Sequence, residues 1–160
     1  MATFEIETAE QMRELGQRIA AQLIAGDIVV LTGPLGAGKT TFVQGIGSGL
    51  GVTGDVTSPT FVVARQHRAG TQEIGLLHID AYRLQTSEDL IDLDIDDTNP
   101  HVTVIEWGEP FIDQVSDSWL SVIISRDTTS DDDSPENGVR LVQVTTHGPA
   151  WRDRAIKVET

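Results

Sequence analysis

The chain has 160 residues, enough for one domain with a helix-covered sheet, but too few for a motor, a transporter ATPase or a separate substrate domain. Its net charge of −14, from 25 acidic and 11 basic residues, argues against a protein that grips a nucleic-acid backbone by itself. The chain has no cysteine, and therefore no disulfide framework or thiolate metal site, and no apolar stretch near the ~18 residues of a membrane span. Because its start also lacks the features of a secretion signal, we expect a cytoplasmic protein with no membrane attachment.

The first part of the chain predicts alternating strands and helices. Residues 4–6 form a short edge strand, and Thr8 with Gln11 fits a capping box at the start of an amphipathic helix. The apolar residues on one face of this helix are Met12, Leu15, Ile19 and Leu23. Residues 28–32 then form a buried strand, and residues 40–50 form a helix that ends in a glycine-rich segment.

The remaining segments predict two antiparallel strand pairs and one further buried strand. The expected hairpins join residues 61–66 with 74–79, and residues 119–125 with 139–145. Between them, residues 87–94 predict a short acidic helix with Ser87 as its N-cap, and residues 102–105 predict a buried strand that ends at Glu106. The acidic segment 127–137 is expected to be a solvated loop, with a docking segment as the alternative, and residues 147–160 a C-terminal tail.

Residues 33–41 read GPLGAGKTT and lie directly between a predicted strand and a predicted helix, which is the setting of a phosphate-binding loop. Lys39 adds a charge for the terminal phosphates, and the hydroxyl group of Thr40 can ligate magnesium. The helix that begins near Lys39 adds the positive end of its dipole. The glycines that let the backbone N–H groups approach phosphate oxygens are Gly33, Gly36 and Gly38.

This loop indicates a chain that handles a nucleoside triphosphate. The alternative is a glycine-rich turn with no ligand, which the flanking strand and helix disfavour. The expected fold class is α/β, a P-loop NTPase-type three-layer sandwich within a single domain of residues 1–160. Its mixed central β-sheet has helices on both faces and an antiparallel C-terminal hairpin.

A phosphate loop needs an acidic residue at the end of a neighbouring strand to hold magnesium and help order the attacking water. Two positions compete for this task, Glu106 after the run VTVI and Asp80 after the run LLHI. Ligands of open α/β sheets bind at the carboxyl ends of the strands, so both carboxylates are candidates. The alternative for each is an ordinary solvent-facing acid at a strand end.

Four short motifs follow one another along the chain. They are GPLGAGKTT at 33–41, SPTF at 58–61, HIDAYRL at 78–84 and IEWGE at 105–109. In this combination the chain resembles the TsaE family, the small bacterial ATPases of tRNA threonylcarbamoyladenosine synthesis. The resemblance runs from about Thr8 to Gly108 and continues more weakly to about Thr145.

The resemblance implies an ATP site with Mg²⁺. Lys39, Thr40 and Thr41 would bind the phosphates, and Thr40 and Glu106 would ligate the metal. Asp80 would position or activate the hydrolytic water, which makes Lys39, Asp80 and Glu106 the catalytic residues. The nucleotide-binding residues that it implies are Thr8 and Ala9 near the base, then Gly33, Leu35, Gly36, Ala37, Gly38, Lys39, Thr40, Thr41 and Trp107.

Several further residues keep two interpretations. Residues 58–60 are a switch-like segment by resemblance, or a turn fixed by proline. Trp107 lies near the nucleotide or a partner surface, or it is a core tryptophan at a strand end. His78 is expected to be a hydrogen-bonded structural histidine. Tyr82 and Arg83 either fix the loop that contains them and Asp80 or contact a partner protein. The spacing of the motifs gives no support to Arg83 as a cation that stabilises the transition state.

The family also implies partners. The chain would bind the TsaD and TsaB pair and reset it between turnovers by ATP binding and hydrolysis, with low activity alone and only indirect contact with tRNA. The chain departs from the family's sequence pattern at the acidic segment 127–137. This departure leaves the C-terminal contacts open, including any role for Arg140.

Three other functions remain as alternatives. A small-molecule kinase would need a lid with arginines, for which only Arg65, Arg68 and Arg83 are central candidates. A GTPase switch is disfavoured because the guanine-reading NKxD sequence is missing. A structural module that has lost hydrolysis is disfavoured because Lys39 and both candidate carboxylates are present.

Overall fold

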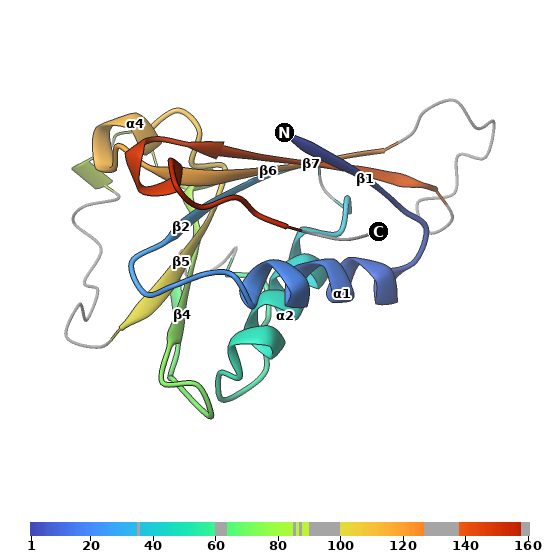
Figure 1. Ribbon diagram of the computed structural model, residues 1–160, viewed down its shortest axis with the longest axis horizontal. Coiled ribbons are helices and arrows are strands. Elements are labelled where there is room, and N and C mark those ends of the chain that lie inside the picture. Colours follow the sequence, from blue (N-terminus) through green and yellow to red (C-terminus); the bar gives the residue numbers. More distant parts are fainter. Residues whose placement is uncertain are drawn as a thin grey trace.

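The computed structural model describes residues 1–34, 36–59, 64–84, 86, 88–89, 100–126 and 138–157. Within these residues a seven-stranded mixed sheet forms the centre of the fold, in the order β1-β7-β6-β2-β5-β4-β3 (Figure 1). The strands are β1 (Ala2–Ile6), β2 (Ile28–Thr32), β3 (Ala64–His67), β4 (Gly75–Asp80), β5 (His101–Glu106), β6 (Trp119–Arg126) and β7 (Arg140–His147). The helices are α1 (Ala9–Ala20), α2 (Lys39–Leu50) and α4 (Ile112–Val115), with 3-10 turns η1 (Ala81–Arg83) and η2 (Pro149–Trp151).

The middle of the sheet is parallel, and this arrangement positions the functional residues. β2 runs parallel to β5 on one side and to β6 on the other, and β5 runs parallel to β4. Leu31 near the end of β2 is the register partner of Glu106, which is itself the partner of Asp80. The carboxyl ends of β2, β5 and β4 therefore meet at one edge, where α/β sheets bind their ligands.

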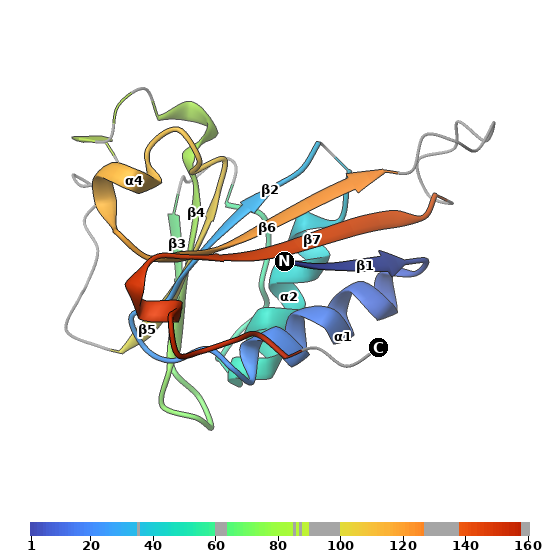
Figure 2. The same cartoon turned by 45° about the horizontal axis from the view of Figure 1, so that its top comes forward.

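Antiparallel pairs flank the parallel strands, as expected. β3 pairs with β4, and β6 pairs with β7 from Trp119 with His147 to Arg126 with Arg140. β1 is one of the two edge strands and pairs with β7 (Figure 2). The two predicted hairpins are confirmed, although residues 61–63 of the first and the whole 127–137 segment lie outside the described residues.

Helices cover both faces of the sheet, which confirms the three-layer α/β architecture. α1 and α2 lie together on one face in both ribbon views (Figures 1 and 2). Side chains alternate along β2, so Val29 and Leu31 join the core with α1 and α2, while Val30 packs with Ile112 of α4. The predicted apolar residues Met12, Leu15, Ile19 and Leu23 are all buried.

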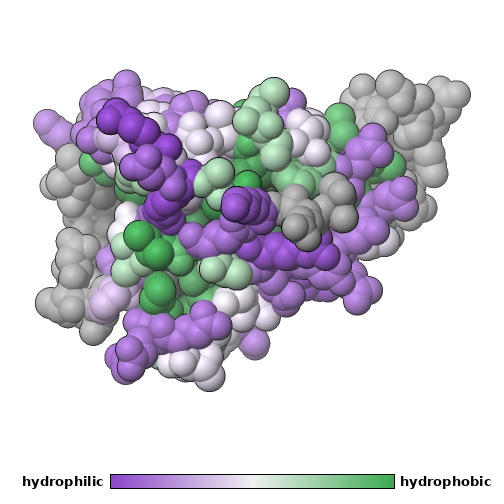
Figure 3. All heavy atoms as spheres, in the orientation of Figure 1, coloured by the Kyte–Doolittle hydropathy of each residue, from purple (hydrophilic) through white to green (hydrophobic). Residues whose placement is uncertain are grey.

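The start of α1 differs in one detail from the expected capping box. Thr8 caps the helix, because its hydroxyl oxygen accepts from the backbone N–H of Gln11 at 3.1 Å. The side chain of Gln11, however, accepts from the backbone N–H of Glu7 at 2.8 Å and not from that of Thr8. The outward face of α1 is hydrophilic (Figure 3), as its amphipathic pattern predicts.

Other predictions are tested only in part. Ser87 and most of the acidic 87–94 helix lie outside the described residues, but Thr86 and Asp89 form reciprocal side-chain to backbone hydrogen bonds there. That exchange is the pattern of a helix start one residue earlier than expected. In the described part of the chain, no helix is both long and apolar enough to cross a membrane.

Candidate nucleotide and magnesium site

Glycine shapes the loop between β2 and α2. α2 begins at Lys39 directly after Gly38, whose φ is 107°, and Gly36 has φ 74°. Other residues are strained in this left-handed region. A Cβ atom at Gly33 would lie 2.8 Å from the backbone oxygen of Ile124 in β6, so the loop also packs closely on the sheet. The loop thus leads into the N-terminus of a twelve-residue helix, where unsatisfied N–H groups favour anions.

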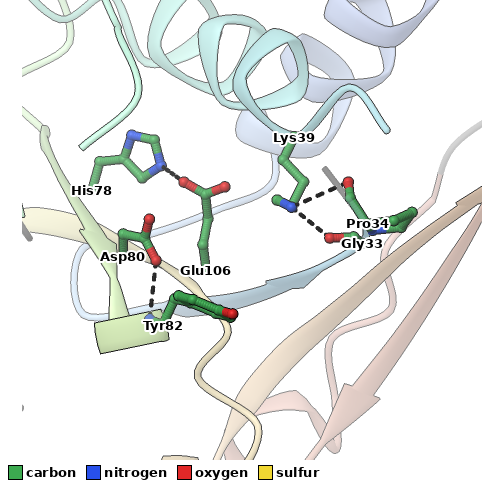
Figure 4. Close-up of polar contacts among 7 residues, drawn as sticks. All are labelled: Gly33, Pro34, Lys39, His78, Asp80, Tyr82 and Glu106. Atoms are coloured by element: carbon green, nitrogen blue, oxygen red, sulfur yellow. Dashed lines mark hydrogen bonds and ion pairs between the residues drawn. The ribbon is translucent and has the colours of Figure 1, made fainter. Parts of the chain in front are cut away.

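Lys39 lies folded against its own loop. Its ammonium group donates hydrogen bonds to the backbone oxygens of Gly33 and Pro34 (Figure 4). The same Nζ atom lies 4.8 Å from the centre of the Trp107 ring, within range of a cation–π contact. The ammonium group thus lies at the phosphate-binding motif, held by two carbonyl oxygens of the loop.

The two candidate carboxylates lie side by side. Asp80 closes β4 and Glu106 closes β5, and both are nearly buried, at 8% and 4% exposure. An oxygen of Asp80 accepts from the backbone N–H of Tyr82 at 3.0 Å, and Oε2 of Glu106 lies 2.8 Å from Nε2 of His78 (Figure 4). The prediction that two strand ends bring carboxylates to one edge is confirmed, and so is the expected hydrogen bond of His78.

Opposite charges share this small space. Desolvation by burial lowers the pKa of Lys39 from its ordinary value of 10.5, while the negative charges of Glu106 and Asp80 raise it. A site that holds a cationic side chain and two carboxylates suits a ligand with both charges, such as a polyphosphate with a divalent cation.

One cavity of about 650 Å³ collects most of the expected residues. Its walls are Pro34, Gly36, Gly38, Lys39, Thr40, Thr41, Ser58, Asp80, Tyr82, Glu106 and Trp107. The loop, the strand ends and the start of the 58–60 segment thus come together in space. Leu35 and Thr60 lie outside the described residues.

A smaller cavity of about 180 Å³ adjoins the first along the loop, because both share Gly36, Gly38 and Thr41 in their walls. Its other lining residues include Thr8 and Ala9, the two residues that the resemblance places near the base. The remaining lining residues are Ile6, Glu7, Met12, Ala37, Gly138 and Arg140. The two residues predicted to contact the base therefore line a cavity next to the one that holds the carboxylates.

Trp107 lines the larger cavity and is only partly buried. Its φ of 61° is rare for a bulky residue. Its backbone N–H donates to the oxygen of Leu31 at 3.2 Å, and its ring meets the exposed Tyr82 ring edge-on, with centroids 5.6 Å apart. Of the two interpretations of Trp107, the structure agrees with a position at the cavity and not in the core.

Two arginines of the C-terminal hairpin reach the phosphate loop. Arg126 donates to the backbone oxygen of Gly36 at 2.9 Å, and Arg140 donates to those of Ala37 at 3.2 Å and Gly138 at 2.7 Å. Desolvation by burial and the nearby charge of Arg126 lower the pKa of Arg140. No local pattern in the sequence points to Arg126 or decides the role of Arg140, because their contacts depend on how the hairpin packs against the loop.

The arginines considered for a kinase lid lie elsewhere. Arg68 lines a separate cavity with Gly75 and His101, the residues that begin β4 and β5. That cavity lies at the N-terminal ends of these strands, whereas the two carboxylates lie at their C-terminal ends. Arg65 is exposed on β3, and the side chain of Arg83 lies outside the described residues.

The donor set fits Mg²⁺ bound together with phosphates. Thr40 and Glu106 line the same cavity, and the Glu106 oxygen not bonded to His78 faces the side on which Lys39 lies (Figure 4). No group of three or more His, Cys, Asp or Glu side chains among the described residues could hold a metal ion. Mg²⁺ at nucleotide sites is held by one or two carboxylates with phosphate oxygens and water, which this arrangement matches.

Comparison with known families identifies the chain. The family model described as threonylcarbamoyl adenosine biosynthesis protein TsaE matches residues 6–134. This range covers most of the chain and includes the loop that lines both cavities. The chain belongs to the TsaE family. Membership connects it with the biosynthesis of tRNA threonylcarbamoyladenosine, as the resemblance predicted.

Individual relatives agree with this assignment. The TsaE protein of Streptomyces coelicolor is 45% identical over 149 residues, which cover 92% of this chain and 98% of that protein. The TsaE protein of Bacillus subtilis is 34% identical over 117 residues, 73% of each chain. The crystal structure of Bacillus subtilis YdiB superposes with a TM-score of 0.70 at 26% identity, over 95% of this chain and 88% of that one.

Proposed function

We propose that this TsaE-family chain is an Mg²⁺-dependent ATPase whose active site is the larger cavity. The observation that carries the proposal is the convergence of Lys39, Thr40, Asp80 and Glu106 on that single cavity. Each supplies a group that phosphoryl transfer to water requires: a cation, a metal-binding hydroxyl, and two carboxylates.

The residues have distinct tasks in this proposal. Lys39 and the backbone N–H groups of the loop bind the phosphates, and Thr40 with Glu106 holds the metal. Bound Mg²⁺ supplies charge neutralisation on the β- and γ-phosphates. Asp80 orients the attacking water, since its carboxylate lies beside that of Glu106 at the parallel strand end. Trp107 covers the phosphate side of the cavity.

The smaller cavity would hold the base and sugar. Thr8 and Ala9 line it together with the apolar side chains of Ile6 and Met12, which suits a flat heteroaromatic ring. Thr41, shared by both cavities, connects this part with the phosphates. ATP is favoured over GTP because the sequence has no NKxD motif.

The ATPase would serve the modification of the adenosine next to the anticodon. In this proposal the cytoplasmic chain, acting over residues 1–160 as one P-loop domain, binds a TsaD–TsaB pair and resets it between turnovers. Its net charge of −14 suits docking on a basic protein surface and leaves tRNA to the partners. Two of the three arginines considered for a kinase lid give that alternative no support, because Arg68 lines a cavity at the other end of the parallel strands and Arg65 is exposed on β3.

Phosphate release from ATP tests the proposal. The chain is assayed with Mg²⁺, first alone and then with the TsaD and TsaB counterparts of its own organism and tRNA. We expect slow release that accelerates with the protein pair. Release that ignores the pair would contradict the resetting role, and no release under either condition would contradict the ATPase.

A further inference from the structure

His78 is completely buried at a strand position that suits a hydrophobic side chain. It lies two residues after Leu76, and its register partner in β5 is Val104, so all three side chains point to the α1–α2 side of the sheet. Its Nδ1 atom has no hydrogen-bond partner among the described residues. A buried polar atom without a partner costs about 1–3 kcal/mol. Packing alone therefore gives no reason for a histidine here.

The reason lies in its other nitrogen. Nε2 of His78 lies 2.8 Å from Oε2 of Glu106, and an ionised carboxylate can only accept, so the imidazole N–H donates. This bond fixes one oxygen of Glu106 and leaves the other facing the side of Lys39 (Figure 4).

Lys39 makes this orientation important. The positive charge of Lys39 attracts Glu106, and a freely rotating carboxylate would close on the ammonium group. Such an ion pair would occupy both the phosphate-binding cation and the metal ligand. A hydrogen-bond donor on the far side of Glu106 opposes this closure.

We propose that His78 is a positioning residue that holds Glu106 in the orientation that ligates Mg²⁺, an inference that rests on the proposed function. The arrangement is that of a metal ligand oriented by an outer hydrogen-bond donor. His78 contacts neither nucleotide nor metal, and its effect passes through Glu106.

Three variants separate positioning from packing. His78→Met fills a similar volume without a donor. His78→Gln places an amide N–H near the position of Nε2 and should keep the bond, whereas His78→Asn ends too short to reach Glu106 and is a second, polar way to remove it. Leu76→Met, on the same face of β4 and paired with Val102 at the other end of β5 from Glu106, is the matched control for a disturbed core.

The measurement is calorimetric binding of a non-hydrolysable ATP analogue at a series of free Mg²⁺ concentrations, and again with excess chelator. We expect His78→Met and His78→Asn to need about tenfold more Mg²⁺ to reach half of the Mg²⁺-induced gain in affinity for the analogue. A loss of this size is typical when a hydrogen-bond partner of a metal ligand is removed. Affinity without Mg²⁺ should stay at the wild-type level, and His78→Gln and Leu76→Met should titrate like wild type.

Two results would overturn the inference in distinguishable ways. In the first, Mg²⁺ increases the affinity of the wild type for the ATP analogue, and it does so at the same concentrations in His78→Met and His78→Asn. His78 then only packs the core, and the proposed ATP site survives. If wild-type affinity itself is independent of Mg²⁺, both the proposed function and the role of His78 fail.

Discussion

Lys39 is one of only two lysines in the chain, and the other, Lys157, lies in the C-terminal segment. Replacing Lys39 by Ala should reduce ATP binding by at least about a hundredfold, since a charge-assisted contact to the phosphates is lost in a partly desolvated site. The melting temperature should change little, because the hydrogen bonds that the ammonium group forms with described residues all go to loop carbonyls. Calorimetry and thermal melting measure both effects, with Lys157→Ala as the control. Undiminished binding by Lys39→Ala would contradict the assignment of the loop.

The neighbouring carboxylates should separate metal binding from water activation. Glu106→Gln keeps the side-chain size but loses the charge, so Mg²⁺ should no longer tighten ATP binding. Asp80→Asn should keep Mg²⁺-dependent binding and slow phosphate release by about 10²-fold, the usual effect of removing a group that orients the nucleophile. Asp113→Asn in α4 is the charge-matched control. An unchanged magnesium titration of Glu106→Gln would move the metal ligand elsewhere.

Motif spacing was sufficient to predict which residue types gather at the site, but not how they pair. Lys39, Asp80 and Glu106 each end or begin a recognisable element, so their placement follows from fold rules. The bond between His78 and Glu106 depends on side-chain rotamers across two strands, which one-dimensional patterns do not encode. Arg126 reaches Gly36 through the packing of a distant hairpin, for the same reason.

The two helices beside the site pack through glycine. A Cβ atom at Gly45 of α2 would lie 2.2 Å from the backbone oxygen of Arg13 in α1, and one at Gly16 would lie 2.4 Å from that of Phe42. Gly45→Ala should therefore destabilise the protein by about 1–3 kcal/mol despite its better helix propensity, because the helices must move apart. Chemical denaturation measures the change, with the exposed Glu14→Ala on α1 as the control. A Gly45→Ala variant as stable as wild type would show that the helices adjust freely.

The β6–β7 hairpin supports the phosphate loop through Arg140. Removing this side chain in Arg140→Ala frees the backbone oxygens of Ala37 and Gly138, so the loop loses an ordered contact beside the smaller cavity. We expect ATP affinity to fall by about tenfold, the worth of one charged hydrogen bond. Arg152→Ala, exposed and distant, should bind as wild type does. Equal affinities for both variants would limit Arg140 to a role in hairpin packing.

Most elements followed from local patterns, and the exceptions have physical reasons. The strands and the two long helices carry clear periodicity and capping signals, so their predicted first and last residues lie close to the observed ones. α4 has only four residues, too few for a helical period to show. In the α1 capping pattern, the side chain of Gln11 accepts from the backbone N–H of Glu7, one residue before the N-cap Thr8.

At the scale of the whole molecule, long-range pairings were the least predictable features. An edge strand was expected at residues 4–6, but its pairing with β7, more than 130 residues later, leaves no local signal. The C-terminal segment behaves similarly, because Arg154 pairs with the buried Asp27 just before β2 at 2.7 Å. Both contacts connect the ends of the chain with its central sheet.

Charge is distributed unevenly over the molecule. The chain is strongly acidic, yet Lys39, Arg126 and Arg140 all contact the phosphate loop. A local positive cluster in an acidic protein attracts a polyphosphate to one place and repels it elsewhere. This distribution favours a nucleotide site over an extended nucleic-acid surface.

The most direct test is a crystal structure of the chain with Mg²⁺ and a non-hydrolysable ATP analogue. We expect the phosphates on the loop at Lys39, the metal between Thr40 and Glu106, and the base in the cavity lined by Thr8 and Ala9. A nucleotide bound away from the loop, or a metal ion that does not contact Glu106, would contradict this expectation.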